Sequence, residues 1–188
     1  MNGGGLTAIL ITGGARSGKS RFAQELAQRP GQPVLFVATA EAGDEEMRHR
    51  IEAHRRVRPT AWRTLETPNR VGQHILQEIG GAKVVIIDCV TLLVSNILNQ
   101  FLDPAGESID GARVEKAVIR EIDELIDCLN RVAAIFIIVT NEVGMGLVPV
   151  NLVGRLYRDL LGKANQRLAE RADEVYLMVS GLPVNIKP

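Results

Sequence analysis

The sequence predicts one three-layer α/β domain, in which helices cover both faces of a mostly parallel sheet. Short apolar segments alternate with amphipathic segments to the end of the chain, as strands joined by crossover helices do. A glycine-rich turn follows the first apolar segment. The 188 residues contain no linker, repeat or low-complexity stretch, so we expect a single domain over residues 1–188.

The elements can be placed one by one from their periodicity and end signals. Strands rich in Val and Ile are expected at 6–12, 34–39, 84–88, 134–140 and 174–179, with a weaker one at 62–66. Helices are expected at 20–28, 45–58, 70–79, 92–101, 112–131 and 156–172. Asp44 can cap the second helix, Pro59 closes it, and Gly80-Gly81 ends the third.

The glycine-rich turn matches the phosphate-binding loop, which is glycine, any four residues, glycine, lysine, and serine or threonine. It consists of Gly13, Gly14, Ala15, Arg16, Ser17, Gly18, Lys19 and Ser20. Its glycines let backbone N–H groups surround an anion, and the following helix points its positive end at the phosphates. Lys19 adds a charge for the outer phosphates, and the Ser20 hydroxyl is placed to hold Mg²⁺. With a strand before it and a helix behind it, the turn predicts a P-loop NTPase-type fold that binds a nucleoside triphosphate, rather than a chance glycine turn.

Ligands of such sheets bind beyond the carboxyl ends of the strands, so the residues that follow each strand are candidates. Asp88 closes an apolar strand, where phosphate-loop enzymes carry an acid that holds magnesium or its water. The alternative role of Asp88 is to cap the next helix. Asn141 and Glu142 follow another strand; they either orient substrate or simply supply polar groups to a glycine-rich turn.

Composition excludes several classes of partner. Lys+Arg and Asp+Glu are both 22 and aromatic residues make up 4%, so no basic or base-stacking surface for nucleic acid is expected. The apolar run 133–139 is far shorter than the ~20 residues of a membrane span, and no leader precedes the first strand. Cys89 and Cys128 lack metal or redox spacing and are interpreted as small core residues. We expect a cytoplasmic protein with no nucleic-acid or membrane partner.

The helix expected at 45–58 has an unusual charged side. Met47, Arg50, Ile51, His54 and Arg58 recur at steps of three and four residues and share that side. Such a run is usually only a solvated face. Arginines around His54, however, favour polyphosphate and would keep the imidazole neutral and therefore nucleophilic.

Several further segments carry a family resemblance together with the phosphate loop. They are Asp44-Glu45-Glu46-Met47, Arg50-Ile51, His54, Arg58-Pro59, Trp62-Arg63-Thr64, Thr140 to Gly146, Val148-Pro149, Arg158-Asp159, Asn165-Gln166-Arg167 and Val179-Ser180-Gly181. In these segments, over nearly the entire chain, the sequence resembles the bifunctional adenosylcobinamide kinase/adenosylcobinamide-phosphate guanylyltransferases of cobalamin biosynthesis. One departure is Ala53, where some relatives carry a second histidine.

The resemblance implies two reactions. The enzyme would phosphorylate the aminopropanol hydroxyl of adenosylcobinamide with ATP or GTP. It would then transfer GMP from GTP to that phosphate, giving adenosylcobinamide-GDP and pyrophosphate. His54 matches the histidine that attacks the α-phosphorus and carries GMP. The phosphate loop and the strand end predict Mg²⁺ held by Ser20 and Asp88. The resemblance also implies a homotrimer, and nucleotide contacts at Gly13 to Ser20, Ala38, Thr39, Ala40, Arg55, Arg56, Val57, Arg58, Glu66 and Asp88.

Two alternative functions follow from the residues. The phosphate loop alone is compatible with a monofunctional small-molecule kinase, which would leave no GMP on the protein. A regulatory NTP switch that signals through partners is the other alternative, and it does not account for His54 among arginines.

Overall fold

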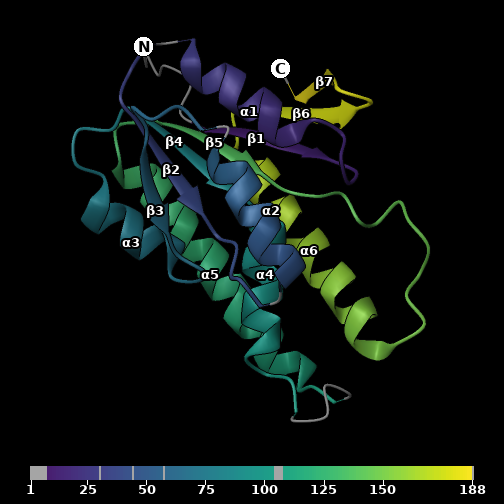
Figure 1. Cartoon of the computed structure of the whole chain (residues 1–188). Helices are drawn as coiled ribbons and strands as arrows, with labels where there is room; N and C mark the ends of the chain where they lie inside the picture. Colours follow the sequence, from purple (N-terminus) through teal and green to yellow (C-terminus); the bar gives the residue numbers. More distant parts are fainter. Residues whose placement is uncertain (1–7, 30, 44, 57, 104–107, 188) are drawn as a thin grey trace.

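The computed structural model describes residues 8–29, 31–43, 45–56, 58–103 and 108–187, apart from the side chains of Glu46, Met47, Arg50 and His54. Its centre is a seven-stranded sheet in the order β3-β2-β4-β5-β1-β6-β7 (Figure 1). The strands are β1 (Ala8–Gly13), β2 (Val34–Ala38), β3 (Arg63–Glu66), β4 (Val84–Asp88), β5 (Ile135–Val139), β6 (Glu174–Val179) and β7 (Leu182–Lys187). Neighbouring strands pair in parallel except β7, which runs antiparallel to β6.

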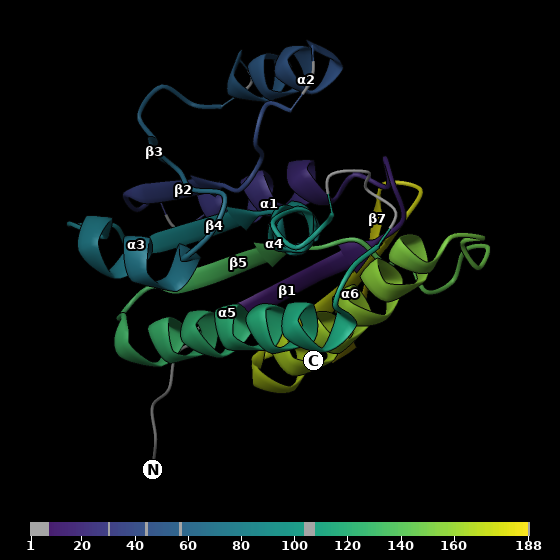
Figure 2. The ribbon, with the colours of Figure 1, turned by 90° about the horizontal axis from the view of Figure 1, so that it is seen from below.

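Helices cover both faces of the sheet. They are α1 (Lys19–Gln28), α2 (Glu45–Arg56), α3 (Val71–Glu78), α4 (Val90–Asn99), α5 (Gly111–Arg131) and α6 (Leu152–Arg171). Figure 2 shows α3, α5 and α6 along one side of the sheet, and α2 on the opposite side, away from the strands. The hydrophobic cluster on the first side takes residues from α3 to α6, and that on the second takes Phe22, Ala23 and Ala27 from α1. The expected three-layer α/β fold is confirmed.

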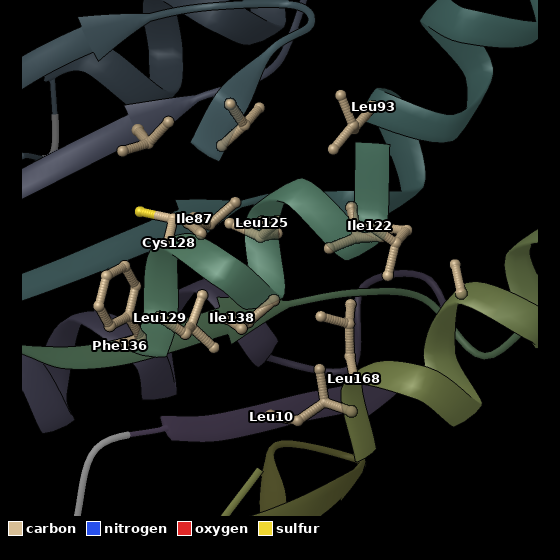
Figure 3. Close-up of a cluster of buried hydrophobic side chains, with 14 of the residues drawn as sticks. Leu10, Ile87, Leu93, Ile122, Leu125, Cys128, Leu129, Phe136, Ile138 and Leu168 are labelled. Carbon is tan, nitrogen blue, oxygen red and sulfur yellow. The ribbon is translucent and has the colours of Figure 1, made fainter. Parts of the chain in front are cut away.

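The core follows from the two-residue period of the strands. Along β1, Ala8 and Leu10 join the larger cluster, whereas Ile9 and Ile11 join the smaller one. Both faces of the strand are therefore apolar, as in parallel sheets covered on both sides. Figure 3 shows the larger cluster, where Leu10, Ile87, Phe136 and Ile138 of the strands meet Ile122, Leu125, Cys128 and Leu129 of α5 and Leu168 of α6. Each large side chain buried there contributes about 1.5–3 kcal/mol.

The sequence expectations missed one strand and misplaced some ends. β7 has no strong apolar run and is held as an edge strand by its antiparallel pairing to β6, a long-range contact that local pattern does not reveal. α6 begins at Leu152 instead of 156, because the Asn151 side chain caps it by accepting from Gly154 N at 2.6 Å. The caps expected from Asp44, and the first two residues of the strand expected at 6–12, lie outside the described residues.

Among the helices that the structure describes, none is long and apolar enough to span a membrane. Most of the large exposed apolar side chains among the described residues lie in two places. One is the loop between β5 and α6, with Met145, Leu147, Val148 and Val150; the other is the β6–β7 hairpin, with Val179, Leu182, Val184 and Ile186.

Candidate active site

The phosphate loop joins β1 to α1 and depends on glycine at two positions. Gly13 has φ +144°, and a Cβ there would lie 2.6 Å from the carbonyl oxygen of Met178. Gly18 has φ +95°, and a Cβ there would lie 3.2 Å from the Cα of Gly181. Any L side chain is strained by such backbone angles, and the β6 side of the loop leaves no room for one. The two motif glycines therefore shape the loop against the β6–β7 turn.

Lys19 lies at the centre of this loop although it is charged. Its side chain is only 7% exposed. Its ammonium group donates hydrogen bonds to the carbonyl oxygens of Gly13 at 3.0 Å and Gly14 at 2.6 Å. A buried ammonium needs such partners, and these hold it against the first two residues of the loop. The loop is thus a preformed cationic cradle.

A cavity of about 400 Å³ opens beside the loop at the carboxyl ends of the strands. Loop residues 15–20 and Arg21 line one part of it. The remaining lining residues come from the ends of β2, β4 and β5 and from α2 and α4: Ala38, Ala40, Ile51, Arg58, Asp88, Cys89, Thr91, Leu92, Val139 and Asn141. This is the position expected for a ligand of a parallel sheet, and its size suits one small-molecule ligand.

Asp88 reaches this cavity from the end of β4. Its Oδ2 is buried and has no hydrogen-bond partner among the described residues. The alternative that Asp88 caps the next helix is not what is seen, because Cys89 occupies the cap position of α4 and no side chain caps that end. A buried unpartnered carboxylate oxygen beside a phosphate loop suits a hard cation. The donor set therefore fits the Mg²⁺ expected at Asp88 and Ser20.

Arg58 enters the same cavity from the segment after α2. Its guanidinium carbon lies 3.8 Å from the ring centroid of Phe36, and Phe36 stacks in turn on Trp62. Nε and one terminal nitrogen of Arg58 are buried with no hydrogen-bond partner among the described residues. Burial lowers the pKa of Arg58 from its ordinary value, and the charge of Asp88 opposes that shift. Arg58 remains a cation that packs on an aromatic face and lines the cavity.

The helix that carries His54 borders the cavity. Ile51 of α2 lines it, and His54 follows one turn later in the same helix; the side chain of His54 lies outside the described residues. Arg55 pairs with Glu66, with Nε to Oε1 at 2.9 Å, and both side chains are about half exposed. Arg56 pairs with Glu52 at 3.9 Å on the surface. Arg55 and Arg56 therefore do not join Arg58 in lining the cavity.

The structure places the predicted site residues in different positions relative to the cavity. Those that line the cavity are Ala15, Arg16, Ser17, Gly18, Lys19, Ser20, Ala38, Ala40, Arg58 and Asp88. Gly13 and Gly14 act through the carbonyl groups that hold Lys19. Arg55, Arg56 and Glu66 are engaged in the surface pairs just described and are absent from the lining. Val57 lies outside the described residues.

Thr39 does not line the cavity but has a structural role beside it. It is fully buried, its hydroxyl donates to the Cys89 carbonyl at 2.7 Å, and it accepts from Cys89 N at 2.8 Å. Its own carbonyl accepts from the Asn96 amide at 2.8 Å. Thr39 thereby ties the end of β2 to the end of β4 and to α4, which sets the positions of Ala38, Ala40 and Asp88 around the cavity.

Sequence reasoning missed several lining residues. Arg21, Ile51, Cys89, Thr91, Leu92 and Val139 were not assigned to the nucleotide site. Thr91 and Leu92 could have been found, because they form the first turn of the helix that follows Asp88. The interpretation of Cys89 as a core residue is incomplete, since it also lines the cavity. Burial and the charge of Asp88 raise its pKa to about 11, so the thiol stays protonated near neutral pH and is a poor nucleophile.

Comparison with known proteins finds relatives over most of the chain. Residues 9–186 match the family model described as cobinamide kinase / cobinamide phosphate guanyltransferase. The bifunctional adenosylcobalamin biosynthesis protein CobU of Escherichia coli is 45% identical over 180 residues, which cover 95% of this chain and 99% of that protein. CobU of Salmonella typhimurium is 44% identical, with 95% and 99% covered. The bifunctional adenosylcobalamin biosynthesis protein CobP of Pseudomonas aeruginosa is 40% identical, with 95% and 96% covered.

Solved structures of more distant proteins share the fold alone. The RadB recombinase superposes with a TM-score of 0.50 at 16% identity, over 93% of this chain and 76% of that one. A protein of Pyrococcus horikoshii superposes with a TM-score of 0.55 at 10% identity, over 97% and 87%. The family match spans the strands, the phosphate loop and the cavity, and on that evidence this chain belongs to the cobinamide kinase / cobinamide phosphate guanyltransferase family.

Proposed function

We propose that this protein phosphorylates adenosylcobinamide with ATP or GTP and then transfers GMP from GTP to the resulting phosphate. The second reaction runs through a GMP–histidine intermediate on His54 and yields adenosylcobinamide-GDP. The observation that carries the proposal is the composition of the cavity. It joins a phosphate loop and an unpartnered carboxylate oxygen of Asp88 with Ile51 from the helix that bears His54.

Phosphoryl transfer to a hydroxyl needs positioning and charge neutralisation more than covalent chemistry. The loop N–H groups and Lys19 supply charge for the outer phosphates. Arg58, stacked on Phe36, supplies a second cation from the far side of Asp88. Burial of these groups strengthens their interaction with a phosphate over its value in water.

A magnesium ion would be held by Ser20 and Asp88, and when bound it would neutralise charge on the phosphate oxygens. No cluster of three or more His, Cys, Asp or Glu is found among the described residues. A nucleotide-bound magnesium needs only one or two side chains, because phosphates and waters complete its shell. Asp88→Asn should therefore weaken the magnesium dependence of both reactions while preserving the fold. A magnesium titration unchanged by the substitution would remove Asp88 from this role.

Guanylyl transfer needs a nucleophile that can leave again, and a neutral imidazole meets that need. In the proposed step, a ring nitrogen of His54 forms a bond to the α-phosphorus, and pyrophosphate leaves. A phosphate oxygen of the substrate then attacks the same phosphorus, and the P–N bond breaks. Nearby arginines would keep the imidazole neutral before attack.

The test uses GTP labelled at one phosphate at a time. Label at the α-phosphate should mark the protein in the absence of cobinamide, and label at the γ-phosphate should not. The adduct should be lost in acid and survive base, which distinguishes a phosphoramidate from an acyl phosphate or a serine ester. His54→Ala should abolish the adduct and guanylyl transfer yet retain phosphorylation of cobinamide.

His49 and His74 serve as internal controls, because changing either one should leave the labelling intact. His49 belongs to the same helix as His54. His74 lies in α3 and is hydrogen-bonded to Thr67 at 2.6 Å. Uptake of α-label by His54→Ala, or its absence from the wild-type protein, would reject the covalent intermediate. Wild-type protein that phosphorylates cobinamide but never carries GMP would instead be a monofunctional kinase.

The proposal also covers the oligomeric state and the domain content of the protein. We expect a homotrimer of single-domain chains, with no nucleic-acid partner. Sedimentation equilibrium should give a mass near three times 20.5 kDa, and a single unfolding transition should be seen over the whole chain. A monomeric mass at working concentration would reject the trimer without affecting the chemistry.

A further inference from the structure

We propose that Asn141 contacts the γ-phosphoryl group during phosphorylation of the substrate hydroxyl and takes no part in guanylyl transfer. The inference rests on the proposed function and deepens it, because it assigns one side of a shared nucleotide site to one of the two reactions. It starts from the place of β5 in the sheet. That strand lies between β4, which carries Asp88, and β1, which leads to the phosphate loop.

The register of the strands places Asn141 beside the loop. Val139 pairs with Asp88 of β4 on one side and with Ile11 of β1 on the other. Two further backbone bonds continue the pairing with β1, from Thr140 N to Ile11 O at 2.9 Å and from Glu142 N to Gly13 O at 3.0 Å. Asn141 is therefore level with Gly13, the first residue of the loop. It also lines the cavity that Lys19, Ser20 and Asp88 line.

The carbonyl oxygen of Gly13 links this turn to the charge of the loop. It accepts from Glu142 N at 3.0 Å and from the Lys19 ammonium at 3.0 Å. The turn after β5 and the phosphate-binding lysine are thus held by the same backbone atom. A side chain that projects into the cavity from position 141 enters next to the outer phosphates, where lysine of such a loop acts.

The backbone of Asn141 is clamped on both sides. Its N–H donates to the Thr91 hydroxyl of α4 at 2.7 Å, and its carbonyl accepts from the Asn165 amide of α6 at 3.0 Å. Asn165 is oriented in turn by the Thr140 hydroxyl, which donates to it at 2.7 Å. Thr140 is fully buried and Thr91 nearly so. These bonds use only the backbone of Asn141, and its carboxamide has no hydrogen-bond partner among the described residues. The carboxamide can therefore meet a ligand from a rigid support.

The chemistry of the carboxamide suits the γ-phosphoryl group. In the kinase step the substrate hydroxyl oxygen forms a bond to the γ-phosphorus. The bond from that phosphorus to the β,γ-bridging oxygen breaks, the oxygen leaves with its electron pair on the nucleoside diphosphate, and the hydroxyl proton passes to water. Charge on the equatorial γ-oxygens must be stabilised as this happens. The side-chain N–H of Asn141 donates to one of those oxygens.

Selectivity for the kinase step follows from the order of the strands that border the cavity. Arg58 stacks on Phe36 of β2, and β2 lies on the other side of β4 from β5. The α2 segment, by which we mean α2 together with Arg58, and Asn141 thus reach the cavity from opposite sides of Asp88. An attack on the α-phosphorus from the α2 segment would leave the γ-phosphate to depart within pyrophosphate. Asn141 then makes no contact that strengthens in that transition state.

The test measures the two reactions separately in the intact protein. Asn141→Ala should lower kcat for transfer of γ-label to cobinamide by roughly a hundredfold, as loss of one preorganised donor does, with little change in KM for the nucleotide. Labelling by α-labelled GTP, and GMP transfer to supplied adenosylcobinamide phosphate, should stay near the wild-type rate. Retained guanylyl transfer would also report that the variant is folded.

Asn141→Asp is the second variant, because it preserves size but replaces the donor by an anion; it should lose the kinase step at least as fully. Asn130→Ala is the matched control, since the Asn130 side chain lies on the surface, where it accepts from Arg171 at 2.7 Å. Equal loss of both reactions in the Asn141 variants, or an undiminished kinase step, would overturn the assignment. A wild-type protein that performs neither reaction would instead reject the proposed function, so the two failures are distinguishable.

Discussion

The phosphate-loop edge, which consists of the phosphate loop and the turn after β5, borders the same cavity as the α2 segment. The two regions are held in different ways. The loop is anchored by Lys19 to the carbonyls of Gly13 and Gly14. The neighbouring turn is anchored through Thr140, which is fully buried. The α2 segment is held by surface pairs such as Arg55–Glu66 and by the stacking of Arg58 on Phe36. Exposed ion pairs stabilise little, so the two halves of the site differ in local stability.

This difference teaches where the chemistry is preorganised. Phosphate binding depends on backbone geometry, which the sheet and two helices enforce. The nucleophile proposed for guanylyl transfer lies on a helix that shares little of the core. Ile51 is the α2 residue that reaches the cavity among those the structure describes. Substitutions in the phosphate loop itself should therefore affect both reactions or the fold, and substitutions near α2 should have narrower effects.

The largest effect is expected for Lys19→Ala. Both reactions need the triphosphate to be held, and loss of one charged contact in a buried site costs a few kcal/mol, or about a hundredfold or more in rate. Steady-state rates of phosphorylation and of guanylyl transfer measure this loss. Lys163→Ala is the control, because Lys163 pairs with Glu115 on the surface. Near-normal turnover of Lys19→Ala would remove the phosphate loop from the mechanism.

Gly13→Ala should destabilise the fold, because the new Cβ would lie 2.6 Å from the Met178 carbonyl at a φ of +144°. Strain of this kind costs about 1–3 kcal/mol, which corresponds to a fall in Tm of roughly 2–12 °C for a chain of this length. Gly14→Ala is the matched control, since a Cβ at Gly14 meets nothing within 4 Å. Thermal unfolding of the two variants without nucleotide compares them, and equal Tm values would show that the loop is not built as tightly as described.

Arg58→Lys tests the stacked cation of the α2 segment. Lysine keeps the charge but loses the planar donors and the face that packs on Phe36. We expect KM for GTP to rise about tenfold, equivalent to about 1.4 kcal/mol. Arg63→Lys is the control, because Arg63 bonds to the Glu78 carbonyl on the surface at 3.0 Å. An unchanged KM would place Arg58 outside the nucleotide contacts.

The smallest effect is expected for Glu66→Gln. It breaks the exposed pair with Arg55, and such pairs contribute about 0–1 kcal/mol. The Tm of unliganded Glu66→Gln should therefore fall by less than that of Gly13→Ala. The difference in Tm between Glu66→Gln and the wild-type protein should shrink as salt is added. A fall as large as that of Gly13→Ala would mean that the α2 segment is as tightly anchored as the loop, which would erase the comparison.

Much of the site could be predicted from particular residues. The spacing of Gly13, Gly18 and Lys19 predicted the loop, because an anion-binding turn between strand and helix is a local structure. Asp88 was found because it ends an apolar strand. The direct nucleotide contacts implied for Arg55 and Glu66 stay predictions, since these two side chains pair with each other in the structure. The position of the His54 side chain stays a prediction as well.

By itself, the sequence determined the succession of strands and helices up to β6, the phosphate loop, and the family, because period, end signals and motif spacing are carried by neighbouring residues. Only the tertiary structure decided that β5 lies between Asp88 and the loop, that Asn141 is level with Gly13, and that Arg58 stacks on Phe36. It also decided that β7 pairs with β6 at the edge. These features depend on which distant segments pack together, and that choice is made by burial of both sheet faces and by hydrogen bonds between residues far apart in the chain.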